Sequence, residues 1–176
     1  MIKEFKFNKK RVLLGILIML VLLLISFFFL LKPEPFIRNV FMKAEHIQIL
    51  GVIGIVFFLS LFYSFLKLIP REYAIQITDE FLLDNSKYES YGKIEWKDIS
   101  KIQRLKENSI ELTISKAVLK NRKTNLLKKF LRFMQNWNCN NRIIISSALL
   151  DCSIEDLFET VTLSYENYKK SSHNRF

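Results

Sequence analysis

Two apolar runs near the start of the chain, residues 12–31 and 47–66, constrain its fold more than any other feature. Neither run contains Lys, Arg, Asp, Glu or His. About twenty helical residues, at a rise of roughly 1.5 Å each, span the ~30 Å hydrocarbon core of a bilayer. We therefore predict a membrane hairpin, with helices at 12–31 and 47–69 joined by an extracytoplasmic connector at 32–46.

The charges beside the two runs predict the orientation of the hairpin. The N-terminal segment, residues 1–11, is strongly basic, and Lys67 and Arg71 follow the second run. Flanking segments rich in Lys and Arg stay in the cytoplasm, so both termini are expected there. The first run ends at Lys32-Pro33 without a small-x-small cleavage site, which predicts a retained anchor rather than a signal peptide.

Small residues in the second run, Gly51, Gly54, Ser60 and Ser64, let helix backbones approach closely. They predict either the seam of the hairpin or a contact between two copies of the chain, so a homo-oligomer is left open. Both runs lack ionisable residues, whereas transport paths and proton relays need such groups within the membrane. We therefore do not expect a transporter.

The segment 72–170 is predicted to be one small α+β domain. Its apolar and polar side chains alternate, as is typical of strands with one buried face. Strands are expected at 73–78, 81–84, 93–96, 99–105, 109–115 and 142–147. Apolar residues at helical spacing then predict a closing helix, which starts at the capping pair Ser153 and Asp156 and precedes a tail at 171–176. This order indicates antiparallel sheets, or a small barrel, closed by one helix.

One stretch of this domain resembles a known family. Residues 94–99 read Ile-Glu-Trp-Lys-Asp-Ile, with Ile102 three positions further on, and they follow a Thr-Asp-Glu turn at 78–80. This pattern is similar to that of bacterial pleckstrin-homology-like domains. The whole chain, including the late Ile-x-Ile-Ser-Ser at 143–147, resembles uncharacterised bacterial inner-membrane proteins with two membrane helices. The resemblance implies a seven-strand barrel closed by the C-terminal helix, and it brings no catalytic residues.

Four residues, Ile94, Trp96, Asp98 and Ile99, carry this resemblance. We interpret Trp96 as an anchor in the core or rim of the barrel and Asp98 as a cap of the following turn. The alternative interpretation makes Trp96 and Asp98 part of a ligand groove.

Motifs for catalysis or cofactor binding are nearly absent from the sequence. Three of the four glycines lie in the apolar runs, so the chain has no Gly-rich phosphate loop. His46 lies in the connector and His173 in the tail, and Cys139 and Cys152 lack the spacing of metal ligands. We expect no enzyme activity, no cofactor and no metal site.

A basic insert at 116–137 is the most unusual part of the domain. It lies in a stretch without acidic residues between Glu111 and Asp151, and its second half has apolar side chains at helical spacing. A basic amphipathic helix with a Trp at its end is typical of segments that lie in a membrane interface. We expect these side chains to contact anionic lipid headgroups: Lys120, Arg122, Lys123, Lys128, Lys129, Arg132 and Trp137.

The alternative for the insert is a helix packed on the domain with its basic face in solvent. Nucleic acid is not expected as a partner, because the domain has only a modest basic excess and the aromatic side chains of the insert share one helix face. The sequence thus predicts a non-enzymatic scaffold that docks on anionic lipid through the insert and engages a protein partner through the barrel. The alternative function is an immunity-type protein, whose hairpin blocks a membrane-active toxin.

Overall fold

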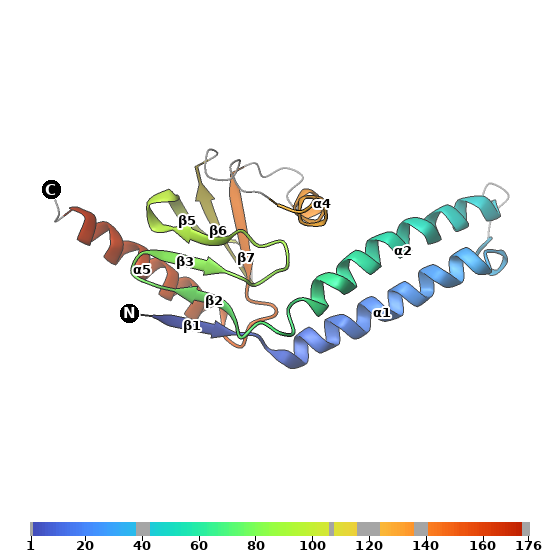
Figure 1. Cartoon of the computed structure of the whole chain (residues 1–176), viewed down its shortest axis with the longest axis horizontal. Helices are drawn as coiled ribbons and strands as arrows, with labels where there is room; N and C mark the ends of the chain where they lie inside the picture. Colours follow the sequence, from blue (N-terminus) through green and yellow to red (C-terminus); the bar gives the residue numbers. More distant parts are fainter. Residues whose placement is uncertain (1, 38–42, 106–107, 116–123, 136–140, 174–176) are drawn as a thin grey trace. The chain divides into compact units, whose positions relative to one another are not determined.

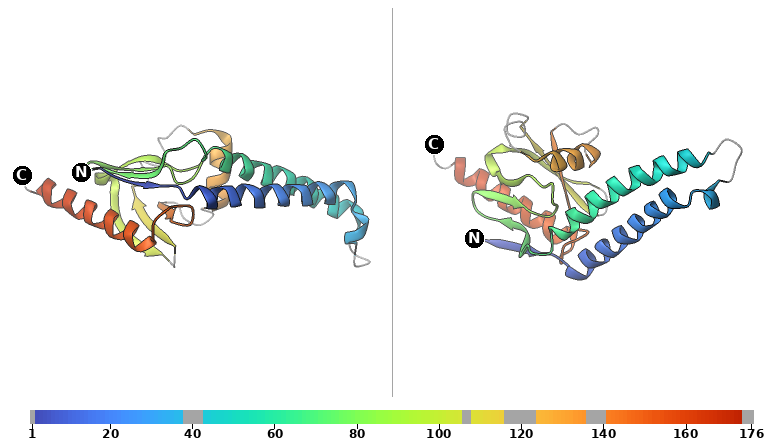
Figure 2. Two further views of the ribbon diagram at one scale, coloured as in Figure 1. Left: turned by 90° about the horizontal axis from the view of Figure 1, so that it is seen from below. Right: turned by 45° about the vertical axis from the view of Figure 1, so that its right-hand side comes forward.

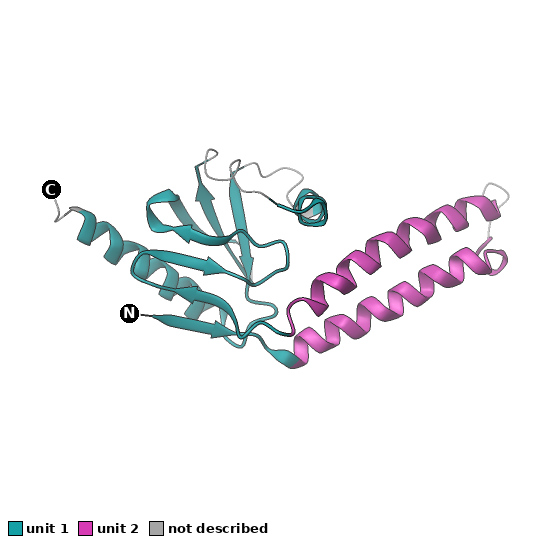
Figure 3. Ribbon diagram, viewed as in Figure 1, with its two compact units in different colours: residues 1–9, 70–176 teal, residues 10–69 magenta. Residues whose placement is uncertain are grey.

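The computed structural model describes residues 2–37, 43–105, 108–115, 124–135 and 141–173. The chain divides into two compact units (Figure 3). Unit 1 comprises Met1–Lys9 and Pro70–Phe176, and unit 2 comprises Lys10–Ile69. Unit 1 therefore contains segments from both sides of unit 2 in the sequence.

Unit 2 is a helical hairpin formed by α1 (Lys9–Leu31) and α2 (Ala44–Leu66). A short 3-10 turn at Glu34–Phe36 follows α1. Both helices are long and apolar enough to cross a membrane, which confirms the prediction of two long apolar helices. Each helix begins three residues earlier than expected, because the polar residues before each apolar run also adopt helical geometry, and α2 ends at Leu66 rather than at residue 69.

Small residues form the seam between α1 and α2. A Cβ atom added to Gly51 would lie 2.8 Å from the backbone nitrogen of Leu30, and one added to Gly54 would lie 2.5 Å from the Ser26 hydroxyl oxygen. Towards the other ends of the helices, a Cβ atom added to Gly15 would collide with the Phe65 ring. The two helices therefore approach each other closely at both of these places, and Gly51 and Gly54 serve the seam of the hairpin.

The described strands of unit 1 form two antiparallel sheets (Figure 1). The first sheet has the order β1-β2-β3-β4, with strands Lys3–Lys6, Tyr73–Ile77, Phe81–Asp84 and Gly92–Glu95. The second has the order β5-β6-β7, with strands Ile99–Leu105, Ser109–Ile114 and Arg142–Ser146. The α+β class is thus confirmed, whereas the described strands do not join into a closed barrel.

Strand β1 was not anticipated, because residues 1–11 were interpreted only as the basic flank of a membrane helix. Phe5 pairs with Ile75 of β2, and a further bridge joins Phe7 to Leu150. The side chains of Phe5 and Phe7 are buried. The apolar alternation that marks this strand covers only a few residues, and the basic residues among them match the flank of a membrane helix equally well.

Helix α5 (Ile154–His173) closes unit 1 and lies beside its strands in each view (Figures 1 and 2). Ser153 caps the helix, since its hydroxyl accepts a hydrogen bond of 3.0 Å from the Asp156 backbone N–H. Leu157 and Val161 are fully buried, and burying a side chain of this size contributes about 1.5–3 kcal/mol. The Tyr165 hydroxyl donates a hydrogen bond of 2.7 Å to the Ile99 carbonyl and ties the helix to β5.

Candidate functional site

Helix α4 (Leu126–Gln135) turns an apolar face towards solvent. Its exposed apolar side chains, with their exposed fractions, are Leu126 (86%), Phe130 (40%), Phe133 (57%) and Met134 (45%). Positions spaced by three, four, seven and eight residues lie on one side of a helix, so these four side chains form one surface. We call this surface the apolar face of α4. Leu131, by contrast, is buried.

Two basic side chains of α4 face the domain instead of solvent. The Arg132 Nε donates a hydrogen bond of 2.6 Å to the Glu89 carbonyl, and its Nη2 donates one of 3.0 Å to the Ser90 carbonyl. The Lys128 amino group lies 5.1 Å from the centroid of the Tyr88 ring. The alternative considered for the insert was a helix with its basic face in solvent. In the structure, Lys128 and Arg132 instead face the domain, and the apolar face meets solvent. Lys129 is the exposed cation of the described helix.

A cavity of about 170 Å³ lies between α4, the connection from β3 to β4, and the residues that precede β2. Four basic residues line it, Arg71, Lys87, Lys128 and Arg132, and the Lys87 amino group donates a hydrogen bond of 3.4 Å to the Ile144 carbonyl. Tyrosine and serine hydroxyls add polar groups to its wall. We call this cavity the cationic pocket. All of its lining residues belong to unit 1.

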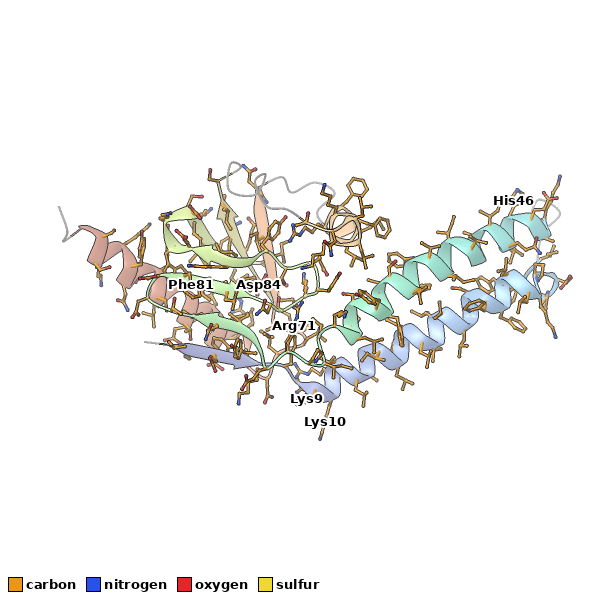
Figure 4. The ribbon with its side chains drawn as sticks, viewed as in Figure 1. Lys9, Lys10, His46, Arg71, Phe81 and Asp84 are labelled. Atoms are coloured by element: carbon orange, nitrogen blue, oxygen red, sulfur yellow. The ribbon has the colours of Figure 1, made fainter. Side chains whose placement is uncertain are left out.

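The Arg71 side chain, which is labelled in Figure 4, is held in place by backbone carbonyls. Its Nη1 donates hydrogen bonds of 2.6 Å to the Asn85 carbonyl and 2.8 Å to the Lys87 carbonyl. Burial lowers the pKa of the Arg71 guanidinium, and the nearby carboxylates of Asp84 and Glu89 oppose this effect.

Burial also lowers the pKa of the Lys128 amino group. The Arg71 and Arg132 cations lower it further, and Glu89 again opposes them. Cations that are partly removed from water and close to one another are stabilised by an anion. The electrostatics of the pocket therefore favour an acidic ligand.

The structure brings together only part of the predicted lipid-contact set. Lys128 and Arg132 line the cationic pocket, and Lys129 points to solvent. The other members, Lys120, Arg122, Lys123 and Trp137, lie outside the described residues.

Sequence reasoning missed two of the four pocket cations, Arg71 and Lys87. Arg71 was interpreted only as a flank of the second helix, and Lys87 was not singled out. The only local signal is the pair of tyrosines at positions 88 and 91 beside Lys87, because the pocket is assembled from three separate segments.

The residues that carry the family resemblance lie mainly in the core. Trp96 is 0% exposed, and its indole Nε1 donates a hydrogen bond of 2.8 Å to the Thr78 carbonyl. Ile94 and Ile99 are also buried. Asp98 is half-buried, and its carbonyl accepts a hydrogen bond of 3.4 Å from the Ser115 N–H. These contacts hold the turn between the two sheets in place.

The described residues contain no group of three or more His, Cys, Asp or Glu side chains that could hold a metal ion. The His46 Nδ1 accepts a hydrogen bond of 3.3 Å from the Lys43 backbone N–H at the start of α2. Cys152 is half-buried, and Cys139 lies outside the described residues.

Comparison of the chain with models of known protein families, with curated proteins and with solved structures gives no match. The function therefore has to be argued from the geometry of the apolar face of α4 and of the cationic pocket.

Proposed function

We propose that this chain is a non-enzymatic, membrane-anchored binding module whose domain docks on the lipid surface through α4. The observation that carries the proposal is the apolar face of α4, which exposes four large side chains in a chain that also has two helices apolar enough to cross a bilayer. An amphipathic helix of this kind binds a membrane favourably, because burial of its apolar face at the boundary between headgroups and acyl chains lowers the free energy of the bound state.

The energetics favour docking of a domain that is already tethered. Complete burial of one Leu or Phe side chain contributes about 1.5–3 kcal/mol, so partial insertion of Leu126, Phe130 and Phe133 is sufficient to hold α4 at the surface. Each basic group near an anionic leaflet adds about 1 kcal/mol, and the exposed Lys129 is placed to contribute. The tether raises the effective concentration of the domain at the membrane.

The pairing of β1 with β2 supports the proposed topology. Strand β1 precedes α1 and β2 follows α2, yet the two strands pair in one sheet. If both helices cross the bilayer, the two ends of the hairpin must lie on the same side. The basic residues near these ends favour the cytoplasmic side, and the family resemblance favours a bacterial inner membrane.

Two antiparallel sheets followed by a closing helix are compatible with the pleckstrin-homology-like resemblance. Within the described strands, β4 and β5 each lie at one edge of a sheet. A strand at an edge can pair with an extended segment of another protein. We propose one of these edges as the surface that engages a protein partner.

A fluorescence experiment on the full chain in nanodiscs tests the docking of α4. Phe130 is replaced by Cys in a variant that carries Cys139→Ser and Cys152→Ser, and the new thiol is labelled with an environment-sensitive fluorophore. The matched control places the label at Leu163 of α5, an apolar position of similar exposure (51% against 40%).

We expect blue-shifted emission at position 130, together with quenching by spin-labelled lipid, and neither effect at position 163. Equal emission and equal quenching at the two positions would contradict the docking of α4.

A further inference from the structure

The cationic pocket gathers four positive charges from three segments of the chain. Arg71 precedes β2, Lys87 lies in the connection from β3 to β4, and Lys128 and Arg132 lie on α4. None of the described residues that line the cavity is a carboxylate. A volume of about 170 Å³ is many times the ~10–15 Å³ that one water requires, so a small polyatomic ion fits.

The nearest carboxylates offset only part of this charge. Asp84 and Glu89 act on the pocket cations from buried positions. One Asp84 oxygen, Oδ1, accepts hydrogen bonds of 2.9 Å from the Ser86 N–H and 2.7 Å from the Ser86 hydroxyl. The residues that line the cavity itself are basic or uncharged, which suits an anion such as a phosphate group.

The two arginines present their charge in fixed positions. Arg71 is held by the carbonyls of residues 85 and 87, and Arg132 by the carbonyls of residues 89 and 90. A planar guanidinium is suited to contacting phosphate oxygens. The connection from β3 to β4 thus orients two guanidinium groups around the cavity before any ligand arrives.

We propose that the cationic pocket binds a phosphate group, with Lys128 and Lys87 as the ammonium partners and Arg71 and Arg132 as the guanidinium partners. A soluble phosphate and the phosphomonoester headgroup of an anionic lipid share this chemistry. Burial and the neighbouring guanidinium groups lower the pKa of Lys128, and a phosphate bound beside it would oppose this effect.

This assignment goes beyond the docking of α4. The apolar face of α4 would enter a bilayer through Leu126, Phe130, Phe133 and Met134, whereas the pocket lies on the side of the helix that faces the domain. A phosphate ion in water can fill the pocket whether or not α4 enters the bilayer, so the two proposals can fail separately.

The test measures lysine acetylation in the full chain by mass spectrometry, with Lys128 in the pocket and Lys129 as the matched control on the same helix. The protein is held in phosphatidylcholine nanodiscs. In the first arm inorganic phosphate is added at constant ionic strength, balanced with chloride. In the second arm part of the phosphatidylcholine is replaced by phosphatidic acid.

At a phosphate concentration ten times Kd, the empty fraction of a site falls to about one tenth. We therefore expect acetylation of Lys128 to slow by about tenfold at this concentration, with the rate at Lys129 unchanged. Protection in the phosphate arm identifies a site for soluble phosphate, and protection by phosphatidic acid alone identifies a site for a lipid headgroup.

Protection of Lys128 in neither arm, or equal protection at Lys128 and Lys129 in the phosphate arm, where the bilayer is neutral, overturns the proposal. The measurement uses the wild-type chain, so it does not depend on the folding of a variant. A Lys87→Gln variant adds a second check, because it should weaken the protection of Lys128, whereas Lys129→Gln should leave that protection intact.

Discussion

The guanidinium carbon of Arg132 lies 4.0 Å from the centroid of the Tyr91 ring. The same side chain donates hydrogen bonds to two carbonyls of the connection from β3 to β4. One residue thus fastens α4 to the domain and fixes which face of the helix meets solvent.

The first prediction concerns this fastening. Replacing Arg132 with Lys removes the paired donors and the stacking on Tyr91, because an ammonium is not planar. Hydrogen bonds to charged groups contribute about 1.5–3 kcal/mol each, so we expect α4 to open at least tenfold more often. Hydrogen–deuterium exchange of the α4 amides in the full chain measures this change. A Lys129→Gln control should exchange like the wild type, and wild-type exchange in the Arg132 variant would contradict the prediction.

The second prediction concerns strand β1. Phe5 is 7% exposed and pairs with Ile75, whereas Ile2 is 67% exposed. Truncating a buried Phe to Ala typically costs about 3–5 kcal/mol, so we expect Phe5→Ala to destabilise unit 1 by about 3 kcal/mol. Ile2→Ala should change stability by less than about 0.5 kcal/mol. Thermal unfolding of the full chain in detergent compares the two variants, and equal melting temperatures would exclude β1 from the sheet.

The third prediction concerns the seam of the hairpin. A Cβ at Gly51 would meet the backbone of Leu30 and Ser26, which cannot move unless the helices separate. We therefore expect Gly51→Ala to destabilise the hairpin by about 1–3 kcal/mol. Gly15→Ala should cost less, since the atoms nearest to its Cβ would belong to the Phe65 ring, and a ring can rotate away. Amide exchange of α1 and α2 in detergent reports the difference, and equal exchange in the two variants would refute this packing.

The fourth prediction concerns the pH dependence of the link between α5 and β5. Hydrogen bonds from its own backbone N–H and from the Arg104 guanidinium hold the pKa of the Glu155 carboxyl below its ordinary value. Because the folded pKa is the lower one, the stabilisation is complete above the ordinary Glu pKa of about 4.3 and is lost as the pH falls through the folded value. Arg104→Gln should raise the pKa of Glu155 in an NMR titration. An unchanged titration curve would show that the pair does not form in solution.

Local patterns predicted most of unit 1. The strand at 81–84 matches β3, and the expected strand at 109–115 matches β6 to within one residue. Apolar spacing likewise located α5, and its cap at Ser153 is confirmed. These elements can be identified from the sequence because the spacing of their apolar residues and the capping or turn residues at their ends are local features.

The remaining features depend on contacts between distant segments. Strand β1 is too short to identify alone, and its partner β2 lies beyond both helices. The amphipathic pattern of α4 was predicted, but the direction of its apolar face depends on Arg132 and the carbonyls of Glu89 and Ser90. Arg71 and Lys87 could not be assigned to a site before the fold placed them beside α4.

Strand β1 also implies an order of assembly. It is made first, but its partner β2 emerges only after both helices of the hairpin. Closing so long a loop in a flexible chain is entropically costly, yet two packed helices hold their ends about 8–10 Å apart. If the hairpin crosses a bilayer as proposed, its insertion would thus bring β1 and β2 together and prepare the sheet for folding. Under the same proposal, a chain with only one helix inserted would leave β1 and β2 on opposite sides of the bilayer, so the first sheet could form only after both helices insert.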